Sequence, residues 1–255
     1  MRAEDYADLY ALEESFWWFA GMREVTNALL DPACPRGQDR LVLDAGCGTG
    51  DMLTRLARYA GGGRVVGIDL FPEALDFCRR RRHQNLLQSS VTDLPFADST
   101  FDLVTSFDVL VQVPGEGSDV RAMREMWRVL RPGGVAFVRA AAYGWMRSGH
   151  DEALGTRRRY VRGELKRKME GAGFRVLRTT YANGLLLPLA ALRRLVLKRV
   201  GLSSSGSDVK PLPPSLGWVN RAFEGALRFE AGLIRRRLDL PAGLSVIVVA
   251  EKPKG

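Results

Sequence analysis

Short apolar runs alternate with helical patterns through the centre of the chain. The runs have the length of buried strands, and the apolar positions between them recur at helical spacing. Apolar strands separated by helices are typical of a parallel sheet that is covered on both faces. The predicted strands are Leu41–Asp44, Val65–Asp69, Leu86–Ser90, Phe101–Phe107 and Val135–Ala140, and the predicted helices are Met52–Tyr59, Pro72–Arg82 and Asp119–Leu130.

Two later runs, Phe174–Tyr181 and Leu244–Ala250, have the same character. About 60 residues separate them, whereas a hairpin loop needs only about two to five. The interval is therefore predicted to be an insertion with two helical stretches, Leu185–Val200 and Leu216–Leu238, joined by a serine- and proline-rich linker. The N-terminal stretch Glu4–Leu30 is also predicted to be helical.

These elements predict a doubly wound, mostly parallel α/β fold of seven strands. Pro132-Gly133-Gly134 is expected to end a helix and turn the chain into the fifth strand. The predicted organisation is a helical lid over residues 1–38, a core over residues 39–181 and 240–255, and a helical insertion over residues 182–239. The insertion is expected on the side of the substrate or of a partner.

The composition is that of an ordinary globular protein, with 46% apolar and 26% charged residues. The first residues have no basic start followed by an apolar run, and no apolar stretch reaches the roughly 20 residues of a membrane span. Three widely spaced cysteines favour neither a disulfide framework nor a metal site. A cytoplasmic location is expected.

A glycine-rich turn follows the first strand, in Asp44-Ala45-Gly46-Cys47-Gly48-Thr49-Gly50. Glycines let a backbone adopt positive φ and pass close to a ligand. The third glycine comes one residue too early for the dinucleotide pattern G-x-G-x-x-G, whose last position is Asp51. A carboxylate there would repel a pyrophosphate, so a ligand with cationic groups fits this turn better.

Two further acids follow the next two predicted strands. Asp69 stands 23 residues after Gly46, a spacing at which a carboxylate can accept hydrogen bonds from ribose hydroxyls. Asp93 follows the third strand, where it can accept a hydrogen bond from an adenine amino group. Any one of these acids could be a helix cap or a solvated loop residue, but three at successive strand ends favour a ligand site.

The glycine turn, Gly67-Ile68-Asp69, Asp93-Leu94-Pro95-Phe96 and Leu130-Arg131-Pro132-Gly133-Gly134 together resemble the class I methyltransferases that use S-adenosylmethionine (SAM). The resemblance covers roughly residues 40–140. It implies a Rossmann-like sheet with an antiparallel last strand, SAM as methyl donor, S-adenosylhomocysteine as product, and no metal. The implied cofactor residues are Asp44, Gly46, Cys47, Gly48, Gly50, Asp69, Leu70, Thr92, Asp93, Leu94, Ser106 and Phe107.

The segment Glu14-Ser15-Phe16-Trp17-Trp18-Phe19 resembles the aromatic N-terminal signature of bacterial methyltransferases from biosynthetic and cell-envelope gene clusters. Those relatives often carry a His-Asp pair and an Arg-Arg-Tyr segment, here His150-Asp151 and Arg158-Arg159-Tyr160. The chain departs from them at Thr156 and at Val111-Gln112, where they carry histidines.

Candidate acceptor-side residues follow from this resemblance and from side-chain chemistry. His150 is a candidate base because histidine exchanges protons near neutral pH, with Asp151 to orient it and Tyr160 as a further catalytic candidate. Trp17 and Trp18 are expected to cover the cofactor, although a plain core role fits them too. Arg158 and Arg159, in a basic stretch over residues 157–168, are suited to an anionic acceptor. The other histidine, His83, is expected to be a solvated residue at a helix end.

The stretch Leu185–Val200 has leucines and valines at helical spacing, with four basic residues among them. Such a helix can lie on an anionic membrane surface, pack on the domain, roof the active site or form a dimer contact.

The leading functional hypothesis is a methyltransferase acting on an oxygen or nitrogen of a small-molecule or lipid-linked metabolite. The net charge of +9 keeps an RNA methyltransferase open as an alternative, but no appended RNA-binding motif accompanies it. A SAM-binding protein without transfer activity is the third class.

Overall fold

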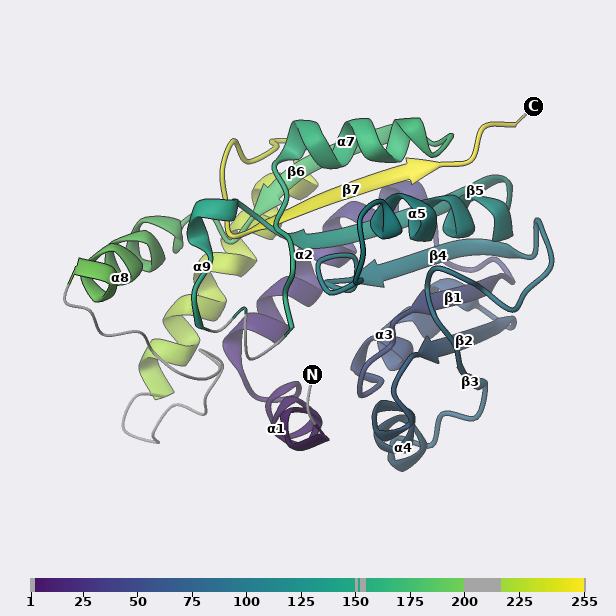
Figure 1. Ribbon diagram of the computed structural model, residues 1–255, viewed down its shortest axis with the longest axis horizontal. Coiled ribbons are helices and arrows are strands. Elements are labelled where there is room, and N and C mark those ends of the chain that lie inside the picture. Colours follow the sequence, from purple (N-terminus) through teal and green to yellow (C-terminus); the bar gives the residue numbers. More distant parts are fainter. Residues whose placement is uncertain (1–2, 150, 152–154, 200–216, 255) are drawn as a thin grey trace.

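The computed structural model describes residues 3–149, 151, 155–199 and 217–254. It contains a seven-stranded sheet in the order β3-β2-β1-β4-β5-β7-β6, in which β7 pairs antiparallel with both neighbours (Figure 1). This confirms the predicted fold. The strands are β1 Leu41–Ala45, β2 Arg64–Asp69, β3 Leu86–Gln88, β4 Phe101–Phe107, β5 Leu130–Ala141, β6 Arg175–Ala182 and β7 Ser245–Glu251.

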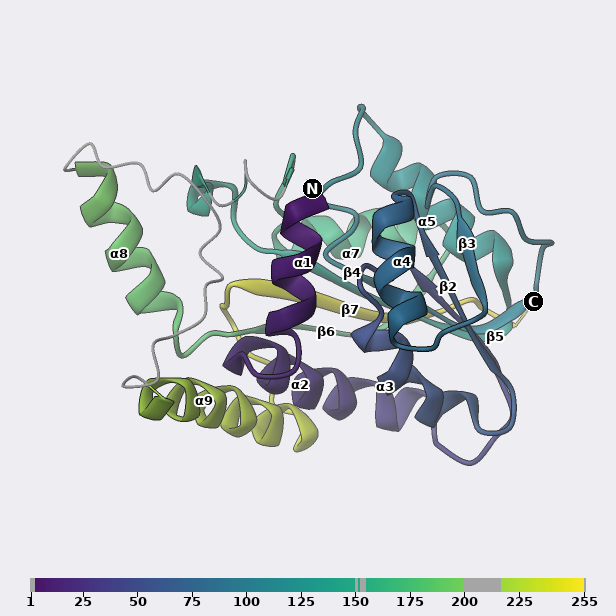
Figure 2. The same ribbon diagram turned by 90° about the horizontal axis from the view of Figure 1, so that it is seen from below.

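Helices cover both faces of the sheet. Figure 2 shows α2, α3 and α9 on one face and α5 and α7 on the other. No helix of the described residues is long and apolar enough to span a bilayer. The helices are α1 Ala3–Leu12, α2 Trp17–Ala33, α3 Asp51–Ala60, α4 Pro72–Arg80, α5 Ser118–Val129, the short 3-10 turn η1 Gly144–Met146, α7 Arg162–Gly171, α8 Leu187–Arg199 and α9 Gly217–Arg235.

The N-terminal helix α2 and the late helix α9 pack against each other and against the same strands. A side chain at Gly21 would lie 2.4 Å from the Leu227 side chain, so only glycine permits this approach. Buried Glu230 on α9 accepts hydrogen bonds from the backbone N–H groups of Asn183 and Leu185, at 2.7 and 2.8 Å. Segments predicted as a lid and as an insertion thus share one hydrophobic core with the sheet.

The N-terminal stretch is two helices, not the continuous helix predicted over Glu4–Leu30. The chain leaves the helical path at Glu13–Phe16, because the polar groups there bond outside the helix. Trp17 N–H donates to Asn220 Oδ1 at 2.9 Å, and Asn220 Nδ2 donates to the carbonyl oxygen of Ser15 at 3.2 Å. The break is therefore fixed by α9, a neighbour about 200 residues away in the sequence.

The strand β5 begins at Leu130, earlier than the predicted Val135. The Pro-Gly-Gly segment that was expected to be a turn is part of the strand, because Gly133 N–H donates to the carbonyl oxygen of Lys252 at 2.7 Å. Gly133 has a φ of +81°, which favours glycine there. The strand β3 is shorter than predicted and ends at Gln88.

Candidate functional site

A cavity of about 960 Å³ opens where the parallel strands β1, β2, β4 and β5 end. Ligands of doubly wound folds bind at this edge of the sheet. Its first side, which we call the cofactor wall, consists of Asp44, residues 46–48 of the glycine turn and Asp69. Its second side, the covering wall, consists of Glu13, Trp17, Trp18 and Arg23 from the segment around α1 and α2.

Asp44 provides a buried carboxylate at the base of the cavity. Its Oδ1 accepts a hydrogen bond from Thr105 Oγ1 at 2.7 Å, whereas Oδ2 has no hydrogen-bond partner among the described residues. Burial raises the pKa of this carboxyl to about 7. A buried carboxylate oxygen without a partner is costly, and a cationic or N–H donor group of a ligand would satisfy it. Asp44 lines the cavity, so a ligand there lies within its reach.

The glycine turn is shaped by close contacts on either side. Gly46 has a φ of +91°, and a side chain there would lie 2.2 Å from Val109 Cγ2. Gly50 does not line the cavity; its carbonyl oxygen lies 3.0 Å from His83 Nε2. His83 is half-buried, and not solvated as predicted, because it packs on this turn; burial lowers its pKa. Cys47 lines the cavity, with its Sγ 3.8 Å from Cys78 Sγ.

Asp69 connects the end of β2 with the glycine turn. Its Oδ2 accepts a hydrogen bond from Gly48 N–H at 2.9 Å and its Oδ1 accepts one from Phe71 N–H at 3.1 Å. Burial raises the pKa of the carboxyl. Asp69, Gly48 and the exposed Leu70 all line the cavity. The structure thus brings seven of the residues predicted to surround the cofactor into one lining: Asp44, Gly46, Cys47, Gly48, Asp69, Leu70 and Phe107.

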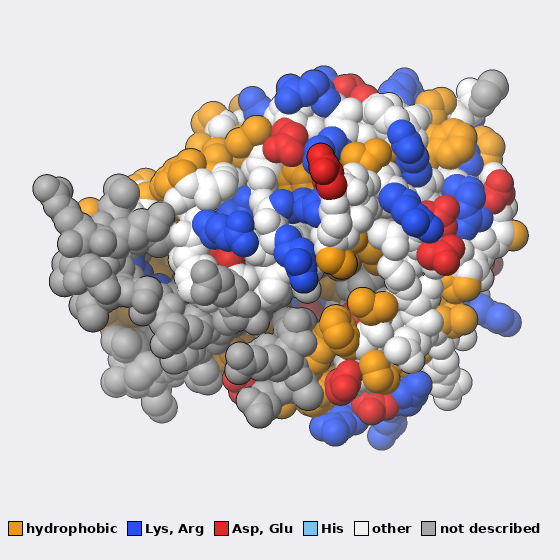
Figure 3. Space-filling model, in the orientation of Figure 1, with side chains coloured by type: hydrophobic (Ala, Val, Ile, Leu, Met, Phe, Trp, Pro, Cys, Tyr) orange, Lys and Arg blue, Asp and Glu red, His pale blue; other side chains and the backbone are white. Residues whose placement is uncertain are grey.

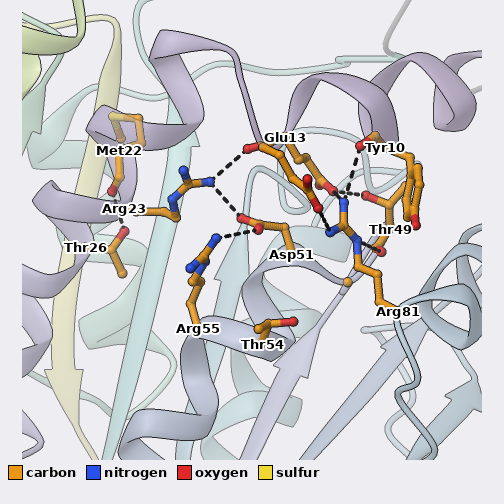
Figure 4. Close-up of polar contacts among 12 residues, drawn as sticks. Tyr10, Glu13, Met22, Arg23, Thr26, Thr49, Asp51, Thr54, Arg55 and Arg81 are labelled. Atoms are coloured by element: carbon orange, nitrogen blue, oxygen red, sulfur yellow. Dashed lines mark hydrogen bonds and ion pairs between the residues drawn. The ribbon is translucent and has the colours of Figure 1, made fainter.

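A polar network joins the covering wall to the glycine turn (Figure 4). Glu13, just after α1, is 7% exposed and accepts a hydrogen bond from Thr49 Oγ1. Arg81 forms an ion pair with Glu13 at 3.0 Å and donates to the carbonyl oxygen of Thr49 at 3.1 Å. Arg23 on α2 donates to the carbonyl oxygen of Glu13 at 2.8 Å and lies 3.3 Å from Asp51. Burial raises the pKa of Glu13 to about 7.

Aromatic side chains and one buried arginine line the cavity beyond the cofactor wall. Trp17, Trp18 and Phe107 all lie in its lining, and their predicted contacts with the cofactor or acceptor stay predictions. Arg139 on β5 stacks on the rings of Trp18 and Phe107, with its guanidinium carbon 4.8 and 5.1 Å from their centroids. Its Nε lies 2.7 Å from Asp108 Oδ2. Arg139 therefore links Trp18 of the covering wall to the ends of β4 and β5.

The loop after β5 forms another part of the cavity. Asp151 is fully buried, and its carboxylate forms an ion pair with Arg159 at 2.7 Å and accepts a hydrogen bond from Ser148 N–H at 2.8 Å. Both residues of this pair line the cavity, and so does Thr156. His150 lies outside the described residues, so its predicted role as a base stays a prediction.

The chain is similar to known methyltransferases over this region. Residues 43–138 match the family model of the methyltransferase domain. A demethylmenaquinone methyltransferase of Symbiobacterium thermophilum is 39% identical over 101 residues, covering 36% of this chain and 39% of that protein. A protein of Mycolicibacterium smegmatis, named a probable S-adenosylmethionine-dependent methyltransferase, is 34% identical over 176 residues, covering 65% of this chain and 62% of that protein.

The chain therefore matches less than two thirds of the length of either relative. Among solved structures, a TehB-like SAM-dependent methyltransferase of Corynebacterium glutamicum has the same fold, with a TM-score of 0.57 and 18% identity; 98% of this chain and 97% of that chain are covered. Residues 43–138 of the chain therefore carry a methyltransferase domain, within a fold that the chain shares with SAM-dependent methyltransferases.

Several residues that the family resemblance placed on the cofactor or acceptor lie outside the cavity lining. Asp93 is exposed, in a turn where Leu94 N–H donates to Glu125 at 2.8 Å. Thr92 belongs to the same turn, with its hydroxyl 2.8 Å from that of Ser90. Ser106 is buried in β4, and its Oγ has no hydrogen-bond partner within the described part of the chain.

Tyr160 and Arg158 also lie away from the cavity, around buried Asp119. The Tyr160 hydroxyl donates to Asp119 Oδ2 at 2.7 Å, and Arg158 Nη1 lies 2.8 Å from Asp119 Oδ1. Burial opposes ionisation of Asp119, but the hydrogen bonds from Lys168 and Tyr160 outweigh it and lower its pKa to about 2. Burial also raises the pKa of Tyr160 above its ordinary range. This geometry favours a structural role and not the catalytic and substrate roles predicted for these two residues.

Sequence reasoning missed Glu13, Arg23, Arg81 and Arg139 as parts of the site. The sequence carries one signal for Glu13, an acid next to the Phe-Trp-Trp-Phe cluster in an otherwise amphipathic stretch. The three arginines are not distinguishable from the many others of this arginine-rich chain, because only the fold brings Arg23 and Arg139 to the cavity and Arg81 to Glu13 beside it.

Proposed function

We propose that this protein transfers a methyl group from SAM to an oxygen or nitrogen of a small-molecule or lipid-linked acceptor, with S-adenosylhomocysteine as the second product. The observation that carries the proposal is the buried Asp44 carboxyl, which lines the cavity and whose Oδ2 has no hydrogen-bond partner in the described structure. SAM carries an ammonium and a sulfonium, so it is complementary to this side of the cavity.

The residues present fit SAM better than a dinucleotide. Asp44, Asp51 and Asp69 all line the same part of the cavity, and their charges would repel a pyrophosphate at the start of α3. The glycine turn leaves room for the ligand, because a side chain on Gly48 would meet only Leu9, at 4.0 Å. Asp44 and the turn would hold the methionine part of SAM, and Asp69 would accept hydrogen bonds from its ribose.

When bound, SAM supplies an activated methyl group for in-line displacement by the acceptor. The protein's contribution is then alignment of the acceptor and exclusion of water. Trp17, Trp18 and Phe107 form an apolar cover over the cavity. Arg139 fixes this cover against the strand ends through its contacts with Trp18 and Asp108. Asp108 and Asp151 are held in ion pairs with arginines, which keeps both carboxylates oriented.

The acceptor is proposed to be small and to carry an anionic or polar group beside an apolar part. Arg157 and Arg193 line the cavity on the side away from the cofactor wall, and Val109 and Val111 contribute apolar surface to it. The relative from Symbiobacterium thermophilum is named for a small-molecule acceptor, demethylmenaquinone. We propose that SAM is the only cofactor and that the protein acts in the cytoplasm.

Calorimetric titration with SAM, beside NAD as a control, tests the cofactor assignment. Dissociation constants in the micromolar range for SAM, with no heat from NAD, are the expected result. Binding of NAD but not of SAM would overturn it. A transfer assay with labelled SAM and a panel of quinone, fatty-acid and RNA acceptors then separates an enzyme from a SAM-binding protein without activity. Methylation of RNA alone, with a steep salt dependence of RNA binding, would overturn the small-molecule assignment.

A further inference from the structure

The helix α8 presents an apolar stripe to solvent at the end of the molecule beyond β6. Figures 1 and 2 both show α8 standing away from the layers that cover the sheet. Leu189 and Leu192 on α8, and Leu185 in the turn leading into it, are 54%, 60% and 53% exposed. Leu189 and Leu192 are three residues apart on α8, so they lie on one side of the helix. Together with exposed Leu185 in the preceding turn, they form the apolar stripe.

The segment that carries this stripe is strongly basic. Between Asn183 and Ser207 the sequence has four basic residues and no Asp or Glu, and the basic residues are Arg193, Arg194, Lys198 and Arg199. An exposed apolar stripe in a segment whose only charged residues are basic is complementary to an anionic lipid surface, in which acyl chains take up apolar side chains and headgroups pair with cations.

Another side of the same helix belongs to the cavity. Ala190 and Arg193 are in the cavity lining, whereas the three leucines face solvent. The helix therefore separates the cavity from the exposed stripe. Figure 3 shows Lys and Arg side chains on the middle of the face seen in Figure 1.

We propose that α8 docks on an anionic lipid bilayer, with Leu185, Leu189 and Leu192 in the apolar layer, and that the positive charge of the segment draws it to anionic headgroups. Charge favours this occupant over a second copy of the chain. A symmetric contact through α8 would bring two segments of positive charge together, with no acid in either segment to neutralise them. Docking in this way holds the mouth of the cavity at the membrane surface.

Vesicle co-sedimentation of the full chain tests the proposal without any methyl acceptor, so its outcome is independent of the proposed transfer activity. Vesicles of phosphatidylcholine with about one third phosphatidylglycerol are compared with pure phosphatidylcholine. The wild-type chain is expected to bind the anionic vesicles at least about tenfold more tightly, and the variant L185S/L189S/L192S is expected to lose at least about tenfold of that affinity. Neutralising the charge with R194Q/K198Q/R199Q is expected to weaken binding to the anionic vesicles alone.

The variant Leu87→Ser is the matched control. Leu87 is 41% exposed on β3, at the opposite edge of the sheet from β6, so its loss is expected to leave vesicle binding unchanged. Unchanged thermal unfolding shows that each variant is folded. Failure of the wild-type chain to bind anionic vesicles would overturn the proposal. So would a triple-serine variant that binds like wild type, or sedimentation data in which that variant converts a dimer into a monomer.

Discussion

The cofactor wall and the covering wall of the cavity are built in different ways. The cofactor wall lies within about 25 residues of sequence. Hydrogen bonds from its own backbone N–H groups hold it together, as from Gly48 N–H to the Asp69 carboxylate and from Gly46 N–H to the carbonyl oxygen of Ile68. The covering wall depends on distant partners, since Trp17 bonds to Asn220 and Glu13 bonds to Thr49. Recognition of the cofactor is therefore largely local, whereas closure of the cavity is a property of the whole fold.

The substitution Asp44→Asn breaks the cofactor wall and is expected to have the largest effect. It removes the charge at the base of the cavity but keeps the shape of the side chain. The SAM dissociation constant is expected to rise at least about 100-fold, which is about 2.7 kcal/mol, in calorimetric titration. Asp76→Asn on α4 is the control, because Asp76 is exposed and pairs only with Arg79 in the contacts found here. Wild-type affinity in Asp44→Asn would contradict the cofactor assignment.

The substitution Gly21→Ala breaks the covering wall without touching the cavity. Its methyl group would lie 2.4 Å from Leu227, so α2 and α9 must separate. The free energy of unfolding is expected to fall by about 1–3 kcal/mol, measured by urea denaturation. Gly225→Ala on α9 is the matched control, because no atom lies within 4 Å of a side chain there. That variant is expected to gain about 0.5–1 kcal/mol from its helix propensity; equal destabilisation of both variants would contradict the packing account.

Changing the pH compares the buried acids of the two walls. Asp44 and Glu13 both have a pKa raised to about 7 by burial. SAM is cationic and favours ionised Asp44, so its affinity is expected to rise about tenfold between pH 6 and pH 8 and to be lost as the pH falls through 7. The raised pKa values have the opposite effect on the free energy of unfolding of the ligand-free protein. A carboxyl whose pKa is raised by folding stabilises the folded state while it is protonated, and this stabilisation is lost as the pH rises through 7.

Calorimetry across this pH range measures the first effect, and urea denaturation without SAM measures the second. The variant Asp44→Asn is expected to flatten the pH dependence of SAM affinity, while Glu13→Gln is expected to leave most of it in place. If Glu13→Gln flattens the pH profile and Asp44→Asn does not, the carboxyl that controls the pH dependence of SAM affinity is Glu13 of the covering wall.

The substitution Arg81→Ala cuts the connection between the two walls and is expected to have the smallest effect on binding. Arg81 pairs with Glu13 and bonds to the glycine turn through Thr49, but it does not line the cavity. The SAM dissociation constant is expected to rise about fivefold, or about 1 kcal/mol, with faster proteolysis in the segment around α1. Arg79→Ala, which removes only an exposed ion pair on α4, is the control. Unchanged proteolysis would show that α1 docks without this network.

The sequence alone determined the order of strands and helices in the centre of the chain, and with it the glycine turn, Asp44 and Asp69. These features follow from short-range rules. The spacing of apolar residues, a glycine in a turn and an acid at the end of a strand can each be recognised within a short stretch of consecutive residues. The family resemblance added the antiparallel direction of β7, which the structure confirms.

Only the tertiary structure decided where the chain ends pack and which arginines reach the cavity. The break at Glu13–Phe16 depends on Asn220, and the position of Arg139 depends on Trp18 and Asp108. Tyr160 and Arg158 lie beside Asp119 instead of the cavity for the same reason. Contacts of this kind join residues far apart in the sequence. The arginines cannot be told apart from the sequence, because their roles depend on the neighbours that the tertiary structure brings to each of them.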